Sequence, residues 1–370
     1  ALQESRGVRL VGLEGAEGPF AIDALREVAD RDTVRLIADY SLKQGRITGA
    51  QVRDTVSGEA FQIHADITLN AAGPWARTLT ASALGEAAPA VKLVKGIHLV
   101  LPAIPGLQDA FLLTAPQDGR VFFVIPWYGR TLVGTTESSV ADVAEAQVTP
   151  AEQAYLLDAV RALMPGLGWT DADVIAGFAG ARTLQAEDAD NLSAQTREFT
   201  ITTPRPGLIW PIGGKYTTAR CDAALVIDTV YALLEMPGPV SLTHRYPLPG
   251  APVGTREGSV MLGDFIGWQR EAMAGLQRRG LASDIVESLT LRHGTRISAI
   301  GALLDEEPAW AARLVEDAPF IEAEVILALR DEGARSMEDI VRRRLPLALI
   351  ARSGAWLPRV QALYAGEASI

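Results

Sequence analysis

The spacing of apolar residues changes near residue 250, and this change divides the chain into a strand-rich body and a helical segment. From Ser259 to Tyr364 the apolar residues recur at helical spacing, with short Gly or Pro breaks. Upstream, short β-branched and aromatic runs bounded by Gly and Pro predict strands. Prolines cluster between the two patterns at Pro237, Pro239, Pro247, Pro249 and Pro252. We therefore predict two domains, residues 1–245 and 246–370.

The upstream body is predicted to be mixed α/β. Two strands, Ile47–Val52 and Phe61–Leu69, flank a turn-like segment and predict a β-hairpin. Further strands are expected at Leu93–Leu101, Val121–Ile125, Thr131–Thr135, Phe199–Thr202 and Leu208–Ile212. Helices are expected at Pro150–Met164, where Thr149 and Glu152 form a capping box, and at Ala219–Leu234.

Composition excludes several classes of protein. With 370 residues the chain has room for two or three domains, and no apolar run reaches the 18 to 20 residues of a membrane-spanning helix. A net charge of −11 argues against nucleic-acid binding. The single cysteine, Cys221, excludes an internal disulfide and favours a reducing compartment, so a cytoplasmic location is expected. The four histidines, His64, His98, His244 and His293, lack ligand spacing, so no metal site is expected.

The chain begins at Ala1, without an initiator Met or a strand-like start. We expect this residue not to be the native N-terminus. Whether residues 1–45 are contiguous in the native chain is left open.

Two turns rich in small residues are candidates for close approach by a ligand. Asn70-Ala71-Ala72-Gly73-Pro74-Trp75 follows a predicted strand, although a tight strand-to-helix turn explains it equally well. Gly213-Gly214-Lys215-Tyr216-Thr217-Thr218 lies between a predicted strand and a helix. Its glycines expose backbone N–H groups at a helix N-terminus, which suits a phosphate or an electron-rich ring edge. The spacing is not that of a Walker loop, and a plain helix start is the alternative.

Cationic or titratable side chains lie near predicted strand ends at His98, Arg182 and Arg197. Arginine suits bidentate phosphate binding, and histidine is the usual proton-transfer residue near neutral pH. Taken singly, each has a structural explanation: a satisfied core histidine, or ion pairs with Glu187, Asp188 or Glu198. Asp118–Trp127 and Gly134–Glu137 are interpreted mainly as sheet core.

Taken together, these patterns resemble the FAD-dependent glycerol-3-phosphate dehydrogenase family in their order and spacing. The resemblance covers roughly residues 46–350. It rests on Asn70–Trp75, Lys95–Val100, Asp118–Trp127, Gly134–Glu137, Gly180–Leu184, Gly213–Thr218, and the helical stretches Ala323–Val325 and Arg330–Arg344.

This resemblance implies an FAD-dependent oxidoreductase fold of the α/β class. An incomplete Rossmann-like FAD domain and a substrate domain with a mixed or antiparallel sheet would form residues 1–245. An all-helical C-terminal domain would form residues 246–370. The implied reaction is oxidation of sn-glycerol 3-phosphate to dihydroxyacetone phosphate, with the C2 hydride passing to FAD and the electrons to quinone. Peripheral contact with the inner face of the cytoplasmic membrane follows, and a homodimer is left open.

The resemblance also assigns roles to residues. FAD would contact Ala71, Ala72, Gly73, Pro74, Trp75, Gly213, Gly214, Lys215, Thr217 and Thr218. The substrate would be surrounded by His98, Arg182, Arg197 and Lys215. Arg182 and Lys215 are expected to stabilise charge, Arg197 to bind phosphate, and His98 to take the proton, because arginine does not deprotonate.

The chain departs from the family pattern at three places. The Gly-rich FAD loop, GxGxxG, is absent, and Gly7 to Gly18 does not replace it. Thr183 stands where Pro is expected, and Glu137 where Asp is expected. Three alternatives remain: an oxidase that uses oxygen, another FAD-dependent oxidoreductase such as an amine oxidase, and a non-catalytic binding or assembly fragment.

Overall fold

The computed structural model describes residues 39–53, 58–77, 79, 89–185, 198–245, 248–252 and 262–367. Contacts within the chain divide it into two compact units. Unit 1 comprises Ala1–Ile97, Thr136–Val148 and Ala179–Ser241. Unit 2 comprises His98–Thr135, Thr149–Phe178 and Leu242–Ile370. The helical segment thus shares a unit with part of the upstream body.

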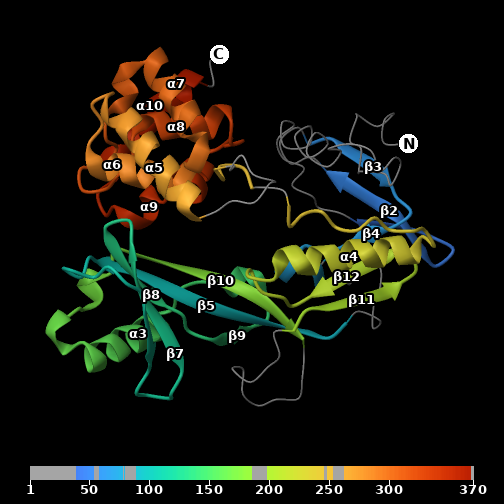
Figure 1. The fold of residues 1–370 in the computed structure, drawn as a ribbon. Helices are drawn as coiled ribbons and strands as arrows, with labels where there is room; N and C mark the ends of the chain where they lie inside the picture. The colour runs from blue at the N-terminus through green and yellow to red at the C-terminus, as the bar shows by residue number, and fades with distance from the viewer. Residues whose placement is uncertain are drawn as a thin grey trace. The chain divides into compact units, whose positions relative to one another are not determined.

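The described strands form three sheets (Figure 1). The first is antiparallel, in the order β1 (Asp39–Lys43), β2 (Arg46–Arg53), β3 (Ala60–His64). The second has the order β11 (Thr200–Arg205), β12 (Leu208–Ile212), β4 (Thr68–Leu69). The third has the order β10 (Ala176–Gln185), β5 (Val91–Pro102), β8 (Arg130–Gly134), β7 (Val121–Trp127), β6 (Phe111–Thr114), and β9 (Ser138–Val140) also pairs with β5.

The predicted strand Phe61–Leu69 is wrong as a single element, because β3 and β4 belong to different sheets. β3 pairs antiparallel with β2, which confirms the hairpin, whereas β4 pairs in parallel with β12. The chain passes from one sheet to the other at residues 65–67. The two sheets approach each other closely at Gly207, in the turn between β11 and β12. This residue has φ +81°, and a Cβ there would lie 2.2 Å from the Ile47 carbonyl oxygen. Only glycine allows this approach.

Two predicted helices are confirmed in the upstream body. α3 (Pro150–Leu163) begins at Thr149, whose Oγ1 accepts a hydrogen bond from the Glu152 N–H and donates one to Glu152 Oε2. α4 (Ala219–Leu233) follows β12. Short 3₁₀ turns lie at η1 (Gly73–Trp75), η3 (Val143–Glu145), η4 (Pro165–Leu167) and η5 (Asp171–Asp173).

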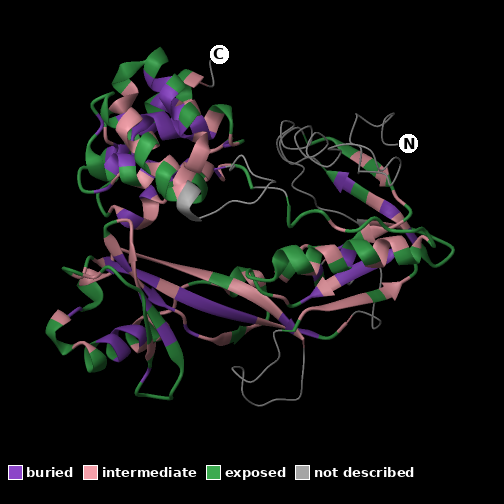
Figure 2. Ribbon diagram, in the orientation of Figure 1, coloured by how far each residue is buried: buried purple, intermediate pink, exposed green. Residues whose placement is uncertain are grey.

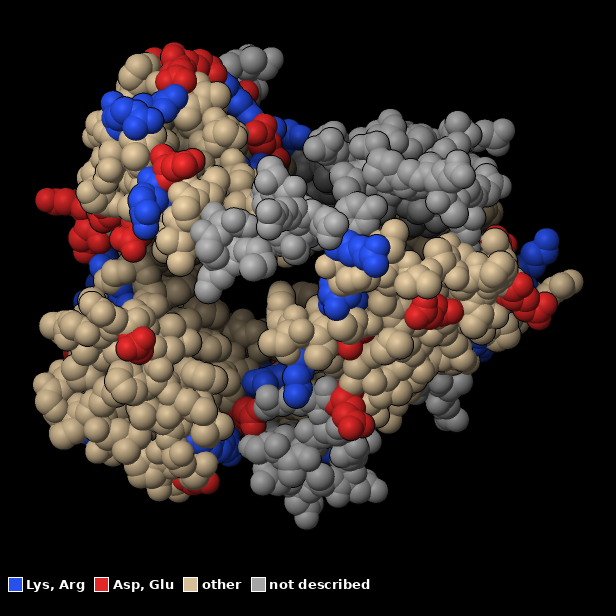
Figure 3. All heavy atoms as spheres, in the orientation of Figure 1, with Lys and Arg blue, Asp and Glu red and all other residues tan. Residues whose placement is uncertain are grey.

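The C-terminal segment is helical, as its apolar spacing predicts. Its α-helices are α5 (Leu262–Gln277), α6 (Ser283–His293), α7 (Ile297–Glu306), α8 (Glu322–Arg330), α9 (Leu347–Ile350) and α10 (Leu357–Glu367). The 3₁₀ turns η7 (Gly294–Arg296), η8 (Pro308–Ala311) and η10 (Gly354–Trp356) and the π-helical η9 (Asp339–Arg344) connect them. Side chains of both charge signs are spread over the face of these helices shown in Figure 3.

α8 is the central helix of the C-terminal segment, with every residue from Glu322 to Ala328 buried (Figure 2). Trp127 and Tyr128, at the β7–β8 turn, pack against the same core. Arg130 strengthens this contact within unit 2, since its Nε donates to the Ile350 carbonyl at 2.8 Å. Among the described residues, no helix is both long and apolar enough to cross a membrane.

Candidate cofactor and substrate site

The two predicted ligand-binding turns follow the same end of a parallel strand pair in unit 1. β4 and β12 run parallel, with Thr68 opposite Leu208 and Leu69 opposite Ile209. The Asn70–Trp75 turn follows β4, and the Gly213–Thr218 loop follows β12. The carboxyl ends of parallel strands therefore bring together two segments separated by more than 130 positions in the sequence. Ligands of open α/β sheets bind at this kind of edge.

Asn70 fixes the first turn from within. Its side chain is 4% exposed, its Nδ2 donates to the Ala76 carbonyl at 3.1 Å, and its Oδ1 accepts from the Ala72 N–H at 3.1 Å. Burial raises the pKa of the Tyr40 phenol to about 12, although a hydrogen bond with the Asn70 side chain opposes this rise. Such local side-chain bonds hold a turn that has few backbone bonds of its own. Trp75, at the end of the turn, is 58% exposed.

The second turn is open to solvent. Gly213 and Gly214 have φ values of +77° and +93°, a backbone conformation that glycine adopts without strain. Lys215, Thr217 and Thr218 are exposed at the start of α4. The predicted placement of this segment between a strand and a helix is confirmed.

The start of α4 suits a neutral ring edge better than a phosphate. Thr218 Oγ1 lies 3.2 Å from the Lys215 carbonyl oxygen and 2.7 Å from Asp222 Oδ2. A carboxylate in the first turn already complements the helix dipole and repels a second anion. Gly213 is exposed and Gly214 half-buried beside the exposed Lys215, at the same strand edge as the Asn70 turn, which suits the polar edge of a planar ring. The phosphate of a substrate needs cations from elsewhere in the site.

Arg182 lies on β10 in unit 1 and forms an ion pair with Glu137, with Nη1 and Oε1 3.6 Å apart. The side chains are 32% and 12% exposed, respectively. The sequence interpretation assigned Glu137 mainly to sheet core and did not foresee this pairing. This ion pair depends on the strand register, which cannot be read from residue types alone.

His98 lies on β5 in unit 2, opposite Gly134 of β8. Its ring stacks on Phe178 of β10, with centroids 5.1 Å apart and planes at 10°. Stacking occupies the ring face, so hydrogen bonding runs through the two nitrogens at the ring edge. The position of His98 relative to Arg182 and Lys215, which belong to unit 1, stays a prediction.

Arg197, predicted to bind phosphate, lies outside the described residues. Among the described residues, no cluster of three or more His, Cys, Asp or Glu side chains is arranged to hold a metal ion.

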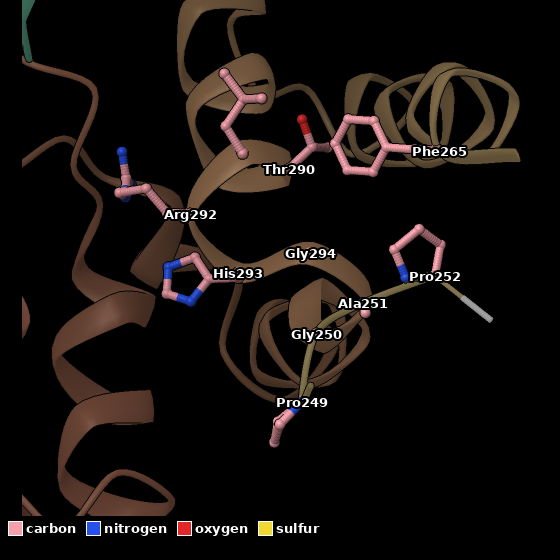
Figure 4. A pocket seen from close by; sticks show the side chains of 10 residues that line it. Pro249, Gly250, Ala251, Pro252, Phe265, Thr290, Arg292, His293 and Gly294 are labelled. Atoms are coloured by element: carbon pink, nitrogen blue, oxygen red, sulfur yellow. The ribbon is translucent and has the colours of Figure 1, made fainter. Parts of the chain in front are cut away.

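A pocket of about 540 Å³ lies within the C-terminal segment, and its lining includes none of the residues predicted to carry chemistry (Figure 4). Arg292 and His293 line it, but both bind the buried carboxylate of Glu324. Both side chains therefore help to hold helices together.

Comparison with known proteins agrees with this arrangement. Residues 19–219 match the family described as FAD dependent oxidoreductase, and residues 241–369 match the C-terminal domain of alpha-glycerophosphate oxidase. Glycerol-3-phosphate dehydrogenase of Mycobacterium leprae is 32% identical over 310 residues, covering 83% of this chain and 51% of that protein. Glycerol-3-phosphate dehydrogenase 2 of Mycobacterium tuberculosis is 31% identical with the same coverage.

A solved structure gives the same result for the fold. The glycerol-3-phosphate dehydrogenase from Bacillus halodurans, complexed with FAD, superposes with a TM-score of 0.75 and 26% identity, covering 94% of this chain and 68% of that one. The chain spans about half the length of the curated relatives described above. The predicted oxidoreductase fold with a C-terminal helical domain is confirmed, and FAD is the cofactor of the matched family. The chain belongs to the FAD-dependent glycerol-3-phosphate dehydrogenase family.

Proposed function

We propose that this protein oxidises sn-glycerol 3-phosphate at C2 to give dihydroxyacetone phosphate. The observation that carries the proposal is the placement of the Asn70–Trp75 and Gly213–Thr218 turns at the same edge of the β4–β12 pair, in a chain whose relatives are named glycerol-3-phosphate dehydrogenases. FAD, when bound, accepts the hydride that leaves C2.

The remaining chemistry belongs to the protein's side chains. In this proposal Asn70–Trp75 and Gly213–Thr218 hold the flavin, and Arg197 binds the substrate phosphate. Arg182 and Lys215 stabilise the negative charge that develops on the C2 oxygen. His98 takes the hydroxyl proton through a ring-edge nitrogen.

We propose quinone as the electron acceptor, with peripheral attachment to the inner face of the cytoplasmic membrane. The match of residues 241–369 to the C-terminal domain of alpha-glycerophosphate oxidase supports a second candidate, in which oxygen accepts the electrons. Peroxide formation distinguishes the two, because only the oxidase releases it in stoichiometric amounts.

Product formation tests the proposed reaction. The FAD-loaded protein, supplied with glycerol 3-phosphate and an artificial electron acceptor, should release dihydroxyacetone phosphate. Arg182→Gln should lower kcat by roughly 10²- to 10³-fold, the usual loss for one transition-state charge donor. Glycerol lacks the phosphate and should be a poor substrate. Equal turnover of both compounds, or no product, would contradict the proposal.

A further inference from the structure

The connection between β8 and β9 contains a β-bulge next to β5. His98 is opposite Gly134, and Lys95 is opposite Ser138. Between these pairs β5 contributes two residues, 96 and 97, whereas the connection contributes three, 135 to 137. One extra residue on one strand defines a bulge, and bulges redirect side chains beside functional sites.

Thr136 fixes the bulge. A bulge interrupts the ladder and leaves backbone groups of the partner strand without their usual acceptors. Here the buried Ile97 N–H donates to Thr136 Oγ1 at 3.1 Å, and Thr136 is itself 3% exposed. The Thr136 hydroxyl thus replaces the missing ladder acceptor. Because this hydrogen bond is buried, it fixes the backbone at Thr136 and with it the direction of the Glu137 side chain.

That next side chain is Glu137, which reaches Arg182. The separation of 3.6 Å is too long for a strong hydrogen bond, so the contact is mainly a charge interaction. Glu137 is the less exposed of the two side chains. Its carboxylate therefore has less freedom to move than the Arg182 guanidinium. The chain carries glutamate where the sequence pattern of the family leads us to expect aspartate, and the extra methylene lengthens the reach toward β10.

We infer that Glu137 is a positioning residue for the reaction, which holds the Arg182 guanidinium in the orientation that stabilises charge at C2. This inference rests on the proposed function. A misplacement of about 1 Å in a reacting geometry can lower the rate roughly 10²-fold, even when the altered residue does not touch the substrate. Glu137 acts in this way through Arg182, and it does not bind the substrate itself.

The role predicts a specific kinetic signature. In the FAD-loaded protein, Glu137→Gln should lower kcat by roughly 10²-fold. The KM for glycerol 3-phosphate should change less than about threefold, because Arg182 keeps its positive charge. Glu137→Asp restores the charge and should recover most of kcat. Binding of inorganic phosphate, measured by calorimetry without turnover, should be retained in Glu137→Gln.

Asp305→Asn is the matched control. Asp305 also pairs with an arginine, Arg279, on the exposed surface of the helical segment, and its loss should leave kcat unchanged. A kcat for Glu137→Gln within twofold of wild type would overturn the positioning role. Equal losses of kcat, FAD affinity and thermal stability in the Gln and Asp variants would also overturn it, by assigning Glu137 to the fold. If wild type itself produced no dihydroxyacetone phosphate, the proposed function would be wrong and the inference would fall with it.

Discussion

Asn70 shows how a single buried amide sets the shape of a turn that we propose to bind FAD. It bonds to Ala72 on one side and to Ala76 on the other, and it contacts Tyr40 of β1. The sequence predicted the turn but not the anchor, because small residues after a strand indicate close approach without showing what holds them. The partner of Arg182 was likewise not predicted. Glu137 is 45 positions away in the sequence, and only the strand register brings the two side chains close.

Replacing Asn70 tests whether this turn holds the cofactor. Asn70→Ala removes the hydrogen bonds to Ala72, Ala76 and Tyr40, each contributing about 0.5–1.5 kcal/mol, so the Kd for FAD should rise at least about tenfold. Equilibrium titration of the apoprotein with FAD, followed by flavin fluorescence, measures this. Gln62→Ala is the control, because this amide lies on the exposed β3 and bonds only to Ser41 among the described contacts. An unchanged Kd in Asn70→Ala would show that the turn does not contact FAD.

At the scale of the element, α8 departs most from what its sequence indicates. Glu322 and Glu324 look like surface residues of an amphipathic helix, yet they are 5% and 2% exposed. Each is buried because another helix supplies a cation: Arg359 binds Glu322, and Arg292 with His293 binds Glu324. Sequence spacing predicts the helices of this segment well, but it cannot reveal which charged residues have distant partners.

Removing one charge from the Glu324 cluster should destabilise the helical segment. Glu324→Ala leaves the partly buried Arg292 and His293 without their carboxylate, and the free energy of unfolding should fall by about 3–5 kcal/mol. Chemical denaturation measures this change. Asp305→Asn, at an exposed pair, should have little effect. Similar effects of the two substitutions would show that the Glu324 cluster contributes no more to the free energy of unfolding than an exposed ion pair does.

The same cluster predicts acid sensitivity. Burial favours the neutral form of Glu324, but the hydrogen bond from His293 and the positive charges of Arg292 and His293 outweigh it and hold its pKa below the ordinary value of 4.5. A carboxyl group whose pKa is lower in the folded state adds stability above pH 4.5 and loses it as the pH falls through the folded-state pKa. Unfolding experiments below pH 4.5 should therefore show a smaller loss of stability in Glu324→Ala than in wild type.

At the scale of the whole molecule, the ordered series of short patterns predicted the fold better than any single pattern. The strand-rich body, the helical C-terminal segment and the FAD-dependent oxidoreductase family are confirmed. The boundary at residues 245 and 246 stays a prediction. Apolar periodicity does not show that His98–Thr135 and Thr149–Phe178 form one compact unit with the C-terminal helices, because the contacts of Trp127, Tyr128 and Arg130 with those helices join distant parts of the sequence.

The proposed reaction passes a hydride from glycerol 3-phosphate to FAD. Its most direct test is the visible absorbance of the FAD-loaded protein during anaerobic titration with glycerol 3-phosphate, with glycerol as the control compound. We expect glycerol 3-phosphate to bleach the flavin band stoichiometrically and glycerol to leave it unchanged, and we expect much slower bleaching in Arg182→Gln. A flavin that stays oxidised with glycerol 3-phosphate would contradict the proposed reaction.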